Sequence, residues 1–419
     1  MRAEREGNRM AQTYRAPKSV CICGIVLVTV ALSGAARAGN RETVLYSFKG
    51  GSDGSNPVAG LIADKAGDLF GTTYQGGAGN DGTVFELSAD GTETVLYAFQ
   101  GGKHDGAYPY AGLIADSSGN LYGTTVQGGI DRCYYNGPIS CGTVFKLAPD
   151  GSETVLHYFP GKEAPYGKVR DGTNPHGSLL LDQSGNLYGT TFGGGHGVGT
   201  VFEVAAGGTE SVVYAFKGDG DPIAGLIADN AGNRYGTTQY GGSFACDFGC
   251  GTVYEVAADG TEKTLYSFAG GSDGAHPVAG LTVDAAGNLY GTTLSGGGTG
   301  CGGSGCGTVF RLAPDKTETV LYGFCAQANC TDGAAPMGAP VEDAAGNFYG
   351  TTSSGGSSND GTVFRVAADG TETVLHSFMG GSDGTDPMSN LIVGKGGDLF
   401  GTTNGGGASG AGTVFRIKP

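Results

Sequence analysis

The sequence predicts an all-β fold, a seven-bladed β-propeller with four strands in each blade. Two observations lead to this class. A Gly-Thr-Thr element and a Gly-Thr-Val element each occur seven times, so one structural unit is repeated along the 419 residues. Each unit contains four short runs rich in Val, Ile, Thr, Tyr and Phe, bounded by Gly, Asp and Asn, as is typical of strands joined by tight turns. Stacking such units radially leaves few open sheet edges.

The repeated elements define seven copies. Gly-Thr-Thr starts at Gly71, Gly123, Gly189, Gly236, Gly291, Gly350 and Gly401. Gly-Thr-Val starts at Gly82, Gly142, Gly199, Gly251, Gly307, Gly361 and Gly412. In the second copy the four predicted strands, named A to D, cover residues 113–116, 121–125, 143–147 and 154–159. The alternative, a parallel β-helix, would need shorter coils and no repeated hairpin turns.

The two ends of the repeat region predict how the ring closes. Residues 43–48 form a lone D strand before the first copy, and the sequence ends after strand C of the seventh copy, at residues 412–417. Pairing these two strands would complete the seventh blade and remove its open edge. We therefore expect residues 39–419 to form one closed propeller.

Residues 1–38 have the pattern of a cleavable secretory signal peptide. Arg15 and Lys18 precede an apolar run over residues 20–32, and a small-residue cleavage site, Ala-Arg-Ala, ends at Ala38. The apolar run is too short to span a bilayer comfortably. We expect a secreted or periplasmic protein after cleavage near Ala38.

The chain is acidic, with a formal net charge of −16. Residues 1–38 hold six of the 24 basic and two of the 40 acidic side chains, so the remaining chain has a net charge of about −20. Such a surface repels the phosphates of nucleic acids and anionic membranes. We expect a monomer that binds neither, and whose partner is an extracellular protein or polysaccharide.

Eight cysteines follow residue 38, and export would permit disulfide bonds. Their positions predict four short-range pairs: Cys133–Cys141, Cys246–Cys250, Cys301–Cys306 and Cys325–Cys330. A shared zinc site is the alternative, but the pairs are assigned to different repeats and the compartment is oxidising.

Length variation is confined to two kinds of connection. The A–B and C–D turns are uniform, whereas the B–C loops and the D–A links differ in length between copies. Antiparallel strands place these two connections at the same end of the ring, which we call the variable face. Variable loops on a rigid scaffold often carry binding sites. The longest loop and the longest link belong to the second copy, and they contribute the predicted ligand-binding residues Arg132, Tyr134, Tyr135, Tyr166, Lys168 and Arg170. The alternative is a decorative loop stapled by a disulfide.

Cofactor and catalytic signals are weak. The D–A links repeat an Asp-Gly-x-x-Pro motif, which could hold Ca²⁺ in a ring of oxygens, although ordinary turn chemistry also explains it. These aspartates are Asp53, Asp105, Asp171, Asp273, Asp332 and Asp383. No cofactor, metal or catalytic residue is assigned. His157 and His376 replace a strand-D tyrosine and are expected to pack within their blades, and Gly71 and its copies are expected where backbones approach closely.

The motif Gly-Asn-Leu-Tyr-Gly-Thr-Thr, followed by Gly-Thr-Val-Phe and Thr-Val-Leu-Tyr-x-Phe, resembles the GloVer (Gloeobacter/Verrucomicrobia) tandem repeat of bacterial exported proteins over residues 43–417. The Gly-Asn-Leu-Tyr element is also similar to NHL-type propeller repeats. The resemblance implies an extracellular protein of unassigned role, without catalytic residues to carry over. We expect a non-enzymatic binding or scaffolding protein that uses the variable face. The alternative is a secreted hydrolase or lyase with its site at the central channel mouth.

Overall fold

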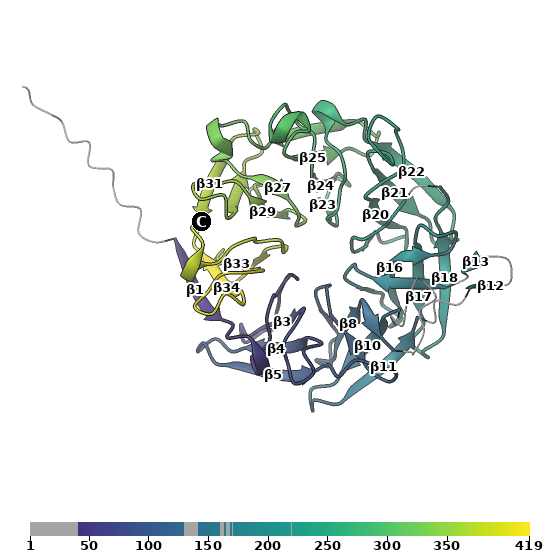
Figure 1. Ribbon diagram of the computed structural model, residues 1–419. Helices are drawn as coiled ribbons and strands as arrows, with labels where there is room; N and C mark the ends of the chain where they lie inside the picture. The colour runs from purple at the N-terminus through teal and green to yellow at the C-terminus, as the bar shows by residue number, and fades with distance from the viewer. Residues whose placement is uncertain (1–40, 130–140, 160–162, 165–167, 170, 219) are drawn as a thin grey trace, which may run out of the picture. The chain divides into compact units, whose positions relative to one another are not determined.

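The computed structural model describes residues 41–129, 141–159, 163–164, 168–169, 171–218 and 220–419. Within the compact unit Asn40–Pro419, seven sheets stand around a common centre (Figure 1). The regular elements of these described residues are strands and short 3-10 turns, without an α-helix. The predicted fold class and the predicted blade number are both confirmed.

Each blade runs from an inner strand A to an outer strand D, and neighbouring strands are antiparallel. Blade 1 contains β2 (Ile62–Ala63), β3 (Leu69–Thr73), β4 (Thr83–Leu87) and β5 (Glu93–Ala98). Blade 2 contains β7 (Ile114–Ala115), β8 (Leu121–Thr125), β10 (Thr143–Leu147) and β11 (Glu153–Tyr158). Blade 3 contains β15 (Leu180–Leu181), β16 (Leu187–Gly194), β17 (Thr200–Val204) and β18 (Glu210–Ala215). Blade 4 contains β19 (Ile227–Ala228), β20 (Arg234–Thr238), β21 (Thr252–Val256) and β22 (Glu262–Ser267).

The remaining blades repeat this order. Blade 5 contains β23 (Thr282–Val283), β24 (Leu289–Thr293), β25 (Thr308–Leu312) and β26 (Glu318–Gly323). Blade 6 contains β28 (Val341–Glu342), β29 (Phe348–Ser354), β30 (Thr362–Val366) and β31 (Glu372–Ser377). Blade 7 contains β32 (Ile392–Val393), β33 (Leu399–Thr403), β34 (Thr413–Ile417) and β1 (Glu42–Ser47). The connections add β6 (Gly106–Ala107), β9 (Gln127–Gly128), β12 (Glu163–Ala164), β13 (Lys168–Val169), β14 (Gly172–Pro175) and β27 (Ala334–Pro336). The 3-10 turns are η1 (Gly51–Asp53), η2 (Gly271–Asp273), η3 (Cys301–Gly303), η4 (Ala328–Cys330) and η5 (Gly381–Asp383).

Strand β1 closes the ring, as predicted. It pairs antiparallel with β34, with Glu42 opposite Ile417 and Ser47 opposite Thr413. The sheet order β1-β34-β33-β32 therefore joins the first strand of the repeat region to the last blade. The backbone groups of β34 that would otherwise form an open edge are paired.

The inner strands are shorter than the sequence predicts. In blade 2, strand A covers only Ile114–Ala115 instead of residues 113–116. The Asp116 carboxylate accepts hydrogen bonds from the backbone N–H groups of Ser118 and Asn120, 2.8 and 3.0 Å away, so the chain already turns at Asp116.

The threonines of the two repeated elements hold the blades together. Within a blade, Thr73 Oγ1 and Thr83 Oγ1 are hydrogen-bonded at 2.8 Å, and the equivalent pair recurs in all seven blades. Between blades, Thr72 Oγ1 donates to the Ala111 carbonyl oxygen of the next blade at 3.2 Å, and this bond recurs at six of the seven junctions. These hydrogen bonds explain why the threonines of Gly-Thr-Thr and Gly-Thr-Val recur in every copy.

The glycine of Gly-Thr-Thr makes room for a side chain. A Cβ on Gly71 would lie 2.7 Å from the ring of Phe85 and 2.9 Å from Leu61. The expectation that backbones approach closely here is wrong, because the neighbouring atoms belong to side chains.

The core lies between adjacent blades and not within one sheet. The Phe after each strand D meets the aromatic ring of strand C in the next blade edge-to-face, as Phe99 meets Phe145 with ring centroids 5.1 Å apart. The same contact recurs at every junction, including the closing one. Both rings of the Phe99–Phe145 pair are fully buried, so hydrophobic burial and ring geometry both stabilise the ring of blades.

Three of the four predicted disulfides lie in the described residues: Cys246–Cys250, Cys301–Cys306 and Cys325–Cys330. Cys141 is also disulfide-bonded, and its predicted partner Cys133 lies outside the described residues. The last two bridges lie in the B–C loop of blade 5 and in the link between blades 5 and 6. They are neighbours, because the sulfurs of Cys301, Cys306 and Cys330 lie within 4.8 Å of one another. The predicted pairing of these cysteines is confirmed.

Candidate functional site

The B–C loops and the D–A links share one end of the ring, as the variable-face prediction requires. The link that enters a blade pairs through its backbone with the B–C loop of that blade, as Ser55 does with Gln75 and Ala275 with Ser295. Strand pairs β6–β9, β14–β16 and β27–β29 make the same connection in blades 2, 3 and 6. Both kinds of variable segment thus surround the same surface.

The centre of the variable face is a hollow of about 350 Å³ to which all seven blades contribute. In every blade the contributing residue is the one that follows the link proline: Val58, Tyr110, His176, Ile223, Val278, Met337 and Met388. Three residues that follow a Gly-Thr-Thr element complete the lining: Phe192, Gln239 and Leu294. The residues after the link prolines lie just before the inner strands A, and the other three lie just after strands B. The hollow therefore lies at the mouth of the central channel.

Aromatic rings form an arc along this mouth. Tyr110 packs edge-to-face against His176 at 5.3 Å, and His176 packs against Phe192 at 5.7 Å. Tyr74 continues the arc at 6.1 Å from Tyr110 and 5.1 Å from Tyr108. Nδ1 of His176 donates to the Asn174 carbonyl at 2.8 Å, and burial lowers the pKa of this histidine. A neutral ring therefore completes an apolar wall.

A second hollow of about 570 Å³ lies between the B–C loops of blades 4 and 5, and a third of about 270 Å³ lies on the other side of the blade 4 loop. The mouth and the second hollow share Gln239 and Leu294. The second and third hollows share Tyr240 and Phe248. The three hollows therefore adjoin one another on the variable face, and together we call them the variable-face hollow.

The loop between the second and third hollows is fixed by a disulfide and presents an aromatic side chain. Cys246–Cys250 closes this loop, and Phe248 between the two cysteines is 72% exposed. The ring of Tyr240 packs edge-to-face against the rings of Phe248 and His276, with centroid distances of 6.1 and 5.6 Å. An exposed phenylalanine held on a short covalent loop is a preorganised contact for a ligand.

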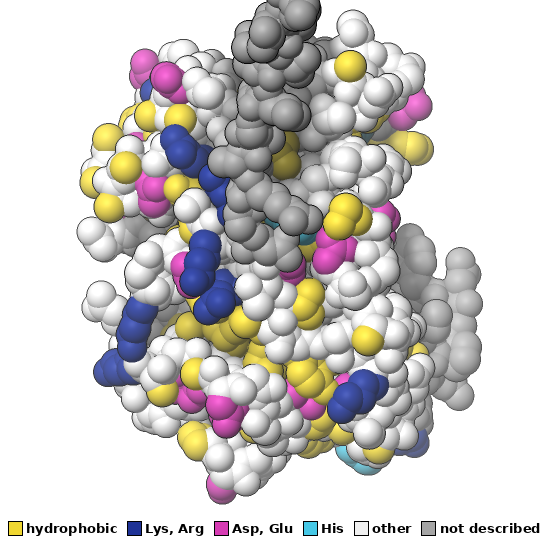
Figure 2. Space-filling model, turned by 90° about the vertical axis from the view of Figure 1, so that its left-hand side faces the viewer, with side chains coloured by type: hydrophobic (Ala, Val, Ile, Leu, Met, Phe, Trp, Pro, Cys, Tyr) yellow, Lys and Arg dark blue, Asp and Glu magenta, His cyan; other side chains and the backbone are white. Residues whose placement is uncertain are grey.

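The variable-face hollow is nearly free of charge. Its described lining contains Asp221 and Asp247 but neither Lys nor Arg. By contrast, the outer side of the ring seen in Figure 2 carries basic and acidic side chains scattered among apolar ones. The neutral hydrogen-bonding side chains in the hollow include Tyr110, Gln239, Tyr240, Ser295 and Ser304. This lining suits a neutral ligand with apolar faces.

The second hollow also contains a serine–histidine pair. His276 Nδ1 lies 2.9 Å from Ser295 Oγ, within hydrogen-bond distance. Burial lowers the pKa of His276, which favours the neutral imidazole that a general base requires. His276 has a φ of +56°, a left-handed conformation that is uncommon for a non-glycine residue, and its backbone N–H donates to the Cys250 carbonyl at 2.8 Å.

The predicted ligand-binding residues of blade 2 fall largely outside the described part of the chain. This applies to Arg132, Tyr134, Tyr135, Tyr166 and Arg170. Lys168 lies in β13, which pairs with β12. Their role stays a prediction. The variable-face hollow lies instead at the channel mouth and over blades 4 and 5, at positions that the sequence analysis missed. The signal that could have found the mouth is the position after the link proline, which varies in type within an otherwise constant motif.

The link aspartates are engaged at the blade junctions and do not form one central ring. Asp53 Oδ2 accepts hydrogen bonds from Tyr46 Oη and from the Lys49 backbone N–H, both at 2.9 Å. Tyr46 belongs to β1, an outer strand, so this carboxylate lies toward the rim. The turn-chemistry interpretation therefore accounts for the motif without a shared Ca²⁺ ion.

Each described link aspartate also faces a glutamate of the next blade. Burial, together with the charge of the aspartate, raises the pKa of that glutamate. Burial, followed by the charge of Asp105, raises the pKa of Glu153 to about 7. Burial and the charge of Asp273 raise the pKa of Glu318 to about 7. The sequence analysis missed these carboxyl pairs, because Glu and Asp lie on different blades and meet only in the assembled ring.

A repeat-built β-propeller with a ligand-sized hollow on its variable face is the class that fold and site define. The sequence model of the Gloeobacter/Verrucomicrobia repeat matches residues 32–162, 132–329 and 299–419, and the chain belongs to this family. No curated protein matches the chain by sequence. In the described residues, no helix is long and apolar enough to cross a membrane.

Three solved structures are similar to the chain at low sequence identity. The extracellular domain of a candidate one-component system from B. thetaiotaomicron superposes with a TM-score of 0.50 at 10% identity, covering 88% of this chain and 39% of that one. A luciferin-regenerating enzyme gives a TM-score of 0.44 at 13% identity, covering 73% of this chain and 90% of that one. A candidate gluconolactonase gives a TM-score of 0.38 at 14% identity, covering 66% of this chain and 80% of that one. The likeness to the extracellular domain concerns the fold alone.

Proposed function

We propose that this protein is a non-catalytic binding protein that holds a neutral polysaccharide chain in the variable-face hollow. The observation that carries the proposal is the row of three adjoining hollows, which extends from the channel mouth to the loops of blades 4 and 5. It is lined by aromatic and aliphatic side chains with a few neutral polar groups. A sugar ring has apolar C–H faces and a rim of hydroxyl groups, so it matches such a lining.

Two features favour an extended ligand over a single small molecule. The variable-face hollow consists of three adjoining hollows, so several sugar units could contact it at once. Its aromatic side chains, Tyr110, Phe192, Tyr240 and Phe248, come from several blades, which spaces them along that path. A protein partner is the other outcome that the test below distinguishes.

We propose that binding takes place outside the cytoplasm. Three disulfides in the described residues fit an oxidising compartment. Residues 1–38 would serve as the signal peptide, with cleavage near Ala38. The acidic net charge supports a partner other than nucleic acid.

The test compares two phenylalanines of one loop. Phe248 lines the hollow, whereas Phe244 is 78% exposed and does not belong to its lining. The purified protein is screened against neutral and acidic polysaccharides, and Phe248→Ala is expected to weaken binding at least tenfold while Phe244→Ala leaves it unchanged. Binding of a protein from the same compartment in place of any glycan, or equal effects of both variants, would contradict the proposal.

The serine–histidine pair favours a second candidate function, a hydrolase that uses Ser295 as the nucleophile and His276 as the base. A fluorophosphonate probe tests it, because the probe labels serines activated by a neighbouring base. Labelling that disappears in Ser295→Ala would favour the hydrolase. An unlabelled wild-type protein with intact glycan binding would leave the binding function as the one supported.

A further inference from the structure

In the described residues, six of the seven blade junctions carry the same three-residue arrangement at their outer edge. An aromatic residue of one strand D and a glutamate at the start of the next strand D approach the link aspartate between them. The arrangements with all three members described are Tyr46–Asp53–Glu93, Tyr97–Asp105–Glu153, His157–Asp171–Glu210, Tyr266–Asp273–Glu318, Tyr322–Asp332–Glu372 and His376–Asp383–Glu42. Four contain tyrosine and two contain histidine.

At the tyrosine junctions the phenol O–H donates a hydrogen bond to the aspartate carboxylate. Tyr322 Oη donates to Asp332 Oδ2 at 2.7 Å, and Tyr266 Oη donates to Asp273 Oδ2 at 3.0 Å. A protonated phenol that donates its O–H to the aspartate is a poor ligand for a metal ion. These junctions are closed by an ordinary hydrogen bond.

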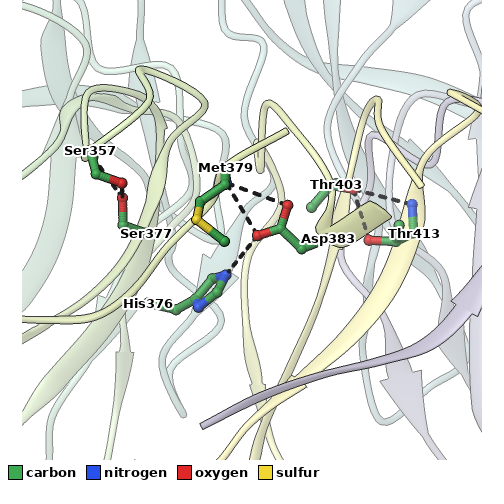
Figure 3. A network of polar contacts seen from close by, with 7 residues as sticks. All are labelled: Ser357, His376, Ser377, Met379, Asp383, Thr403 and Thr413. Atoms are coloured by element: carbon green, nitrogen blue, oxygen red, sulfur yellow. Dashed lines mark hydrogen bonds and ion pairs between the residues drawn. The ribbon is translucent and has the colours of Figure 1, made fainter. Parts of the chain in front are cut away.

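At the two histidine junctions this donor is replaced by an imidazole nitrogen. Nε2 of His157 lies 3.3 Å from Asp171 Oδ2, and Nε2 of His376 lies 3.4 Å from Asp383 Oδ2 (Figure 3). Apart from these ion-pair contacts, neither Nε2 atom has a hydrogen-bond partner within the described part of the chain, although both are buried. Imidazole nitrogen is a common ligand for divalent transition metals.

The glutamates add a buried oxygen without a partner. Oε1 of Glu210 is buried without a hydrogen-bond partner among the described residues, and the same holds for Oε1 of the glutamate at the other five junctions: Glu42, Glu93, Glu153, Glu318 and Glu372. Glu42 as a whole is only 8% exposed. An unpaired carboxylate in such a place is unfavourable unless a cation or a proton compensates it.

The three ligand atoms at the junction of blades 2 and 3 lie close enough to share one ion. Nε2 of His157 and one oxygen each of Asp171 and Glu210 are within 4.8 Å of one another. The 3.3 Å between Nε2 and the Asp171 oxygen is about the separation of two ligands on a tetrahedral Zn²⁺ with bonds of about 2.1 Å. Two carboxylates would also balance the double charge of the ion.

We propose that the histidine junction between blades 2 and 3 is a binding site for one divalent transition-metal ion of the Zn²⁺ class. The ligands are His157, Asp171 and Glu210. Three protein ligands leave a fourth position open to water. The equivalent residues His376, Asp383 and Glu42 do not bring three ligand atoms within 4.8 Å of one another, so the other histidine junction serves as an internal control.

The repeat supplies a matched test, because tyrosine is the residue that the other junctions use. The untagged full chain and the variants His157→Tyr, His376→Tyr and His157→Tyr/His376→Tyr are titrated with Co²⁺, monitored by visible absorption, and with Zn²⁺, monitored by calorimetry. We expect one ion per chain for the wild-type protein and for His376→Tyr, and none for His157→Tyr or the double variant. Zn²⁺ is expected to raise the Tm of the wild-type protein and to leave that of the double variant unchanged.

Two further variants keep the outcome interpretable. His196→Tyr, at an exposed loop histidine, is expected to bind one ion, and Glu210→Gln, which keeps His157, is expected to lose it. A wild-type protein that binds neither metal, or a His157→Tyr variant that still binds one ion, would overturn the proposal and leave His157 as an ion-pair partner. Ca²⁺ displacing Co²⁺ at equal concentration would overturn the assignment to the Zn²⁺ class.

Discussion

Replacing Phe48 with alanine tests whether the strand that closes the ring is energetically part of the propeller. Phe48 follows β1, is fully buried, and meets Phe85 of blade 1 edge-to-face at 5.1 Å. A phenylalanine buries about 150–250 Å², worth about 4–6 kcal/mol at about 25 cal/mol per Å². Measured Phe→Ala substitutions in cores cost about 3–5 kcal/mol. We therefore expect Phe48→Ala to lower the free energy of unfolding by about 4 kcal/mol.

The control is Phe268→Ala, which removes the equivalent ring between blades 4 and 5 in the middle of the chain. Phe268 is also fully buried and meets Phe310 at 5.1 Å. Guanidinium unfolding followed by circular dichroism measures both variants, since the chain has no tryptophan. Equal losses are expected, because a closed ring makes the two junctions equivalent. A loss below about 1 kcal/mol for Phe48→Ala, beside a full loss for Phe268→Ala, would refute closure by β1.

Three more predictions follow from the packing and the charges. Burial and the neighbouring aspartate raise the folded-state pKa of Glu153 to about 7, above its unfolded value, so the stability that this group contributes at low pH is lost as the pH rises through 7. The Tm should fall between pH 5 and pH 8, and less steeply in Glu153→Gln. Gly71→Ala should cost about 1–3 kcal/mol by overpacking, whereas Gly207→Ala, with nothing within 4 Å, should be neutral in the same unfolding assay. Cys246→Ser/Cys250→Ser should lower the free energy of unfolding by about 2 kcal/mol, as expected for so short a loop, and equal stability of variant and wild-type protein would contradict a structural bridge.

The fold could be predicted from the sequence because its determinants recur at fixed spacing. A hairpin is a local structure, so a run of Thr-Val-Phe flanked by Gly predicts a strand regardless of the rest of the chain. The seven units leave one extra strand, β1, at the start of the repeat region and lack one strand D at its end. Pairing of these two ends is the arrangement that completes all seven blades. The short cysteine pairs were predictable for the same reason.

The candidate site could not be predicted in the same way, because it depends on contacts between repeats. Val58 and Met388 are far apart in the sequence and line one hollow only because the ring is closed. The sequence analysis directed attention to the longest loops of blade 2, whereas the variable-face hollow in the described residues depends on shorter loops held by packing. Loop length records where insertions are tolerated, and it carries no information about which loop borders a cavity.

Internal repetition also separates structural from functional positions. Where the copies agree, the structure supplies a reason, such as the paired hydroxyl groups of Thr73 and Thr83 in every blade. The residue after the link proline differs in size and polarity between blades, from Val58 to His176, although the backbone around it is the same. Packing within the blade therefore does not dictate this residue, and its side chain is free to adapt to a ligand. The same logic applies to the two histidine junctions, where the fold is maintained with tyrosine elsewhere, so the exchange to histidine alters the chemistry of the site and leaves the architecture unchanged.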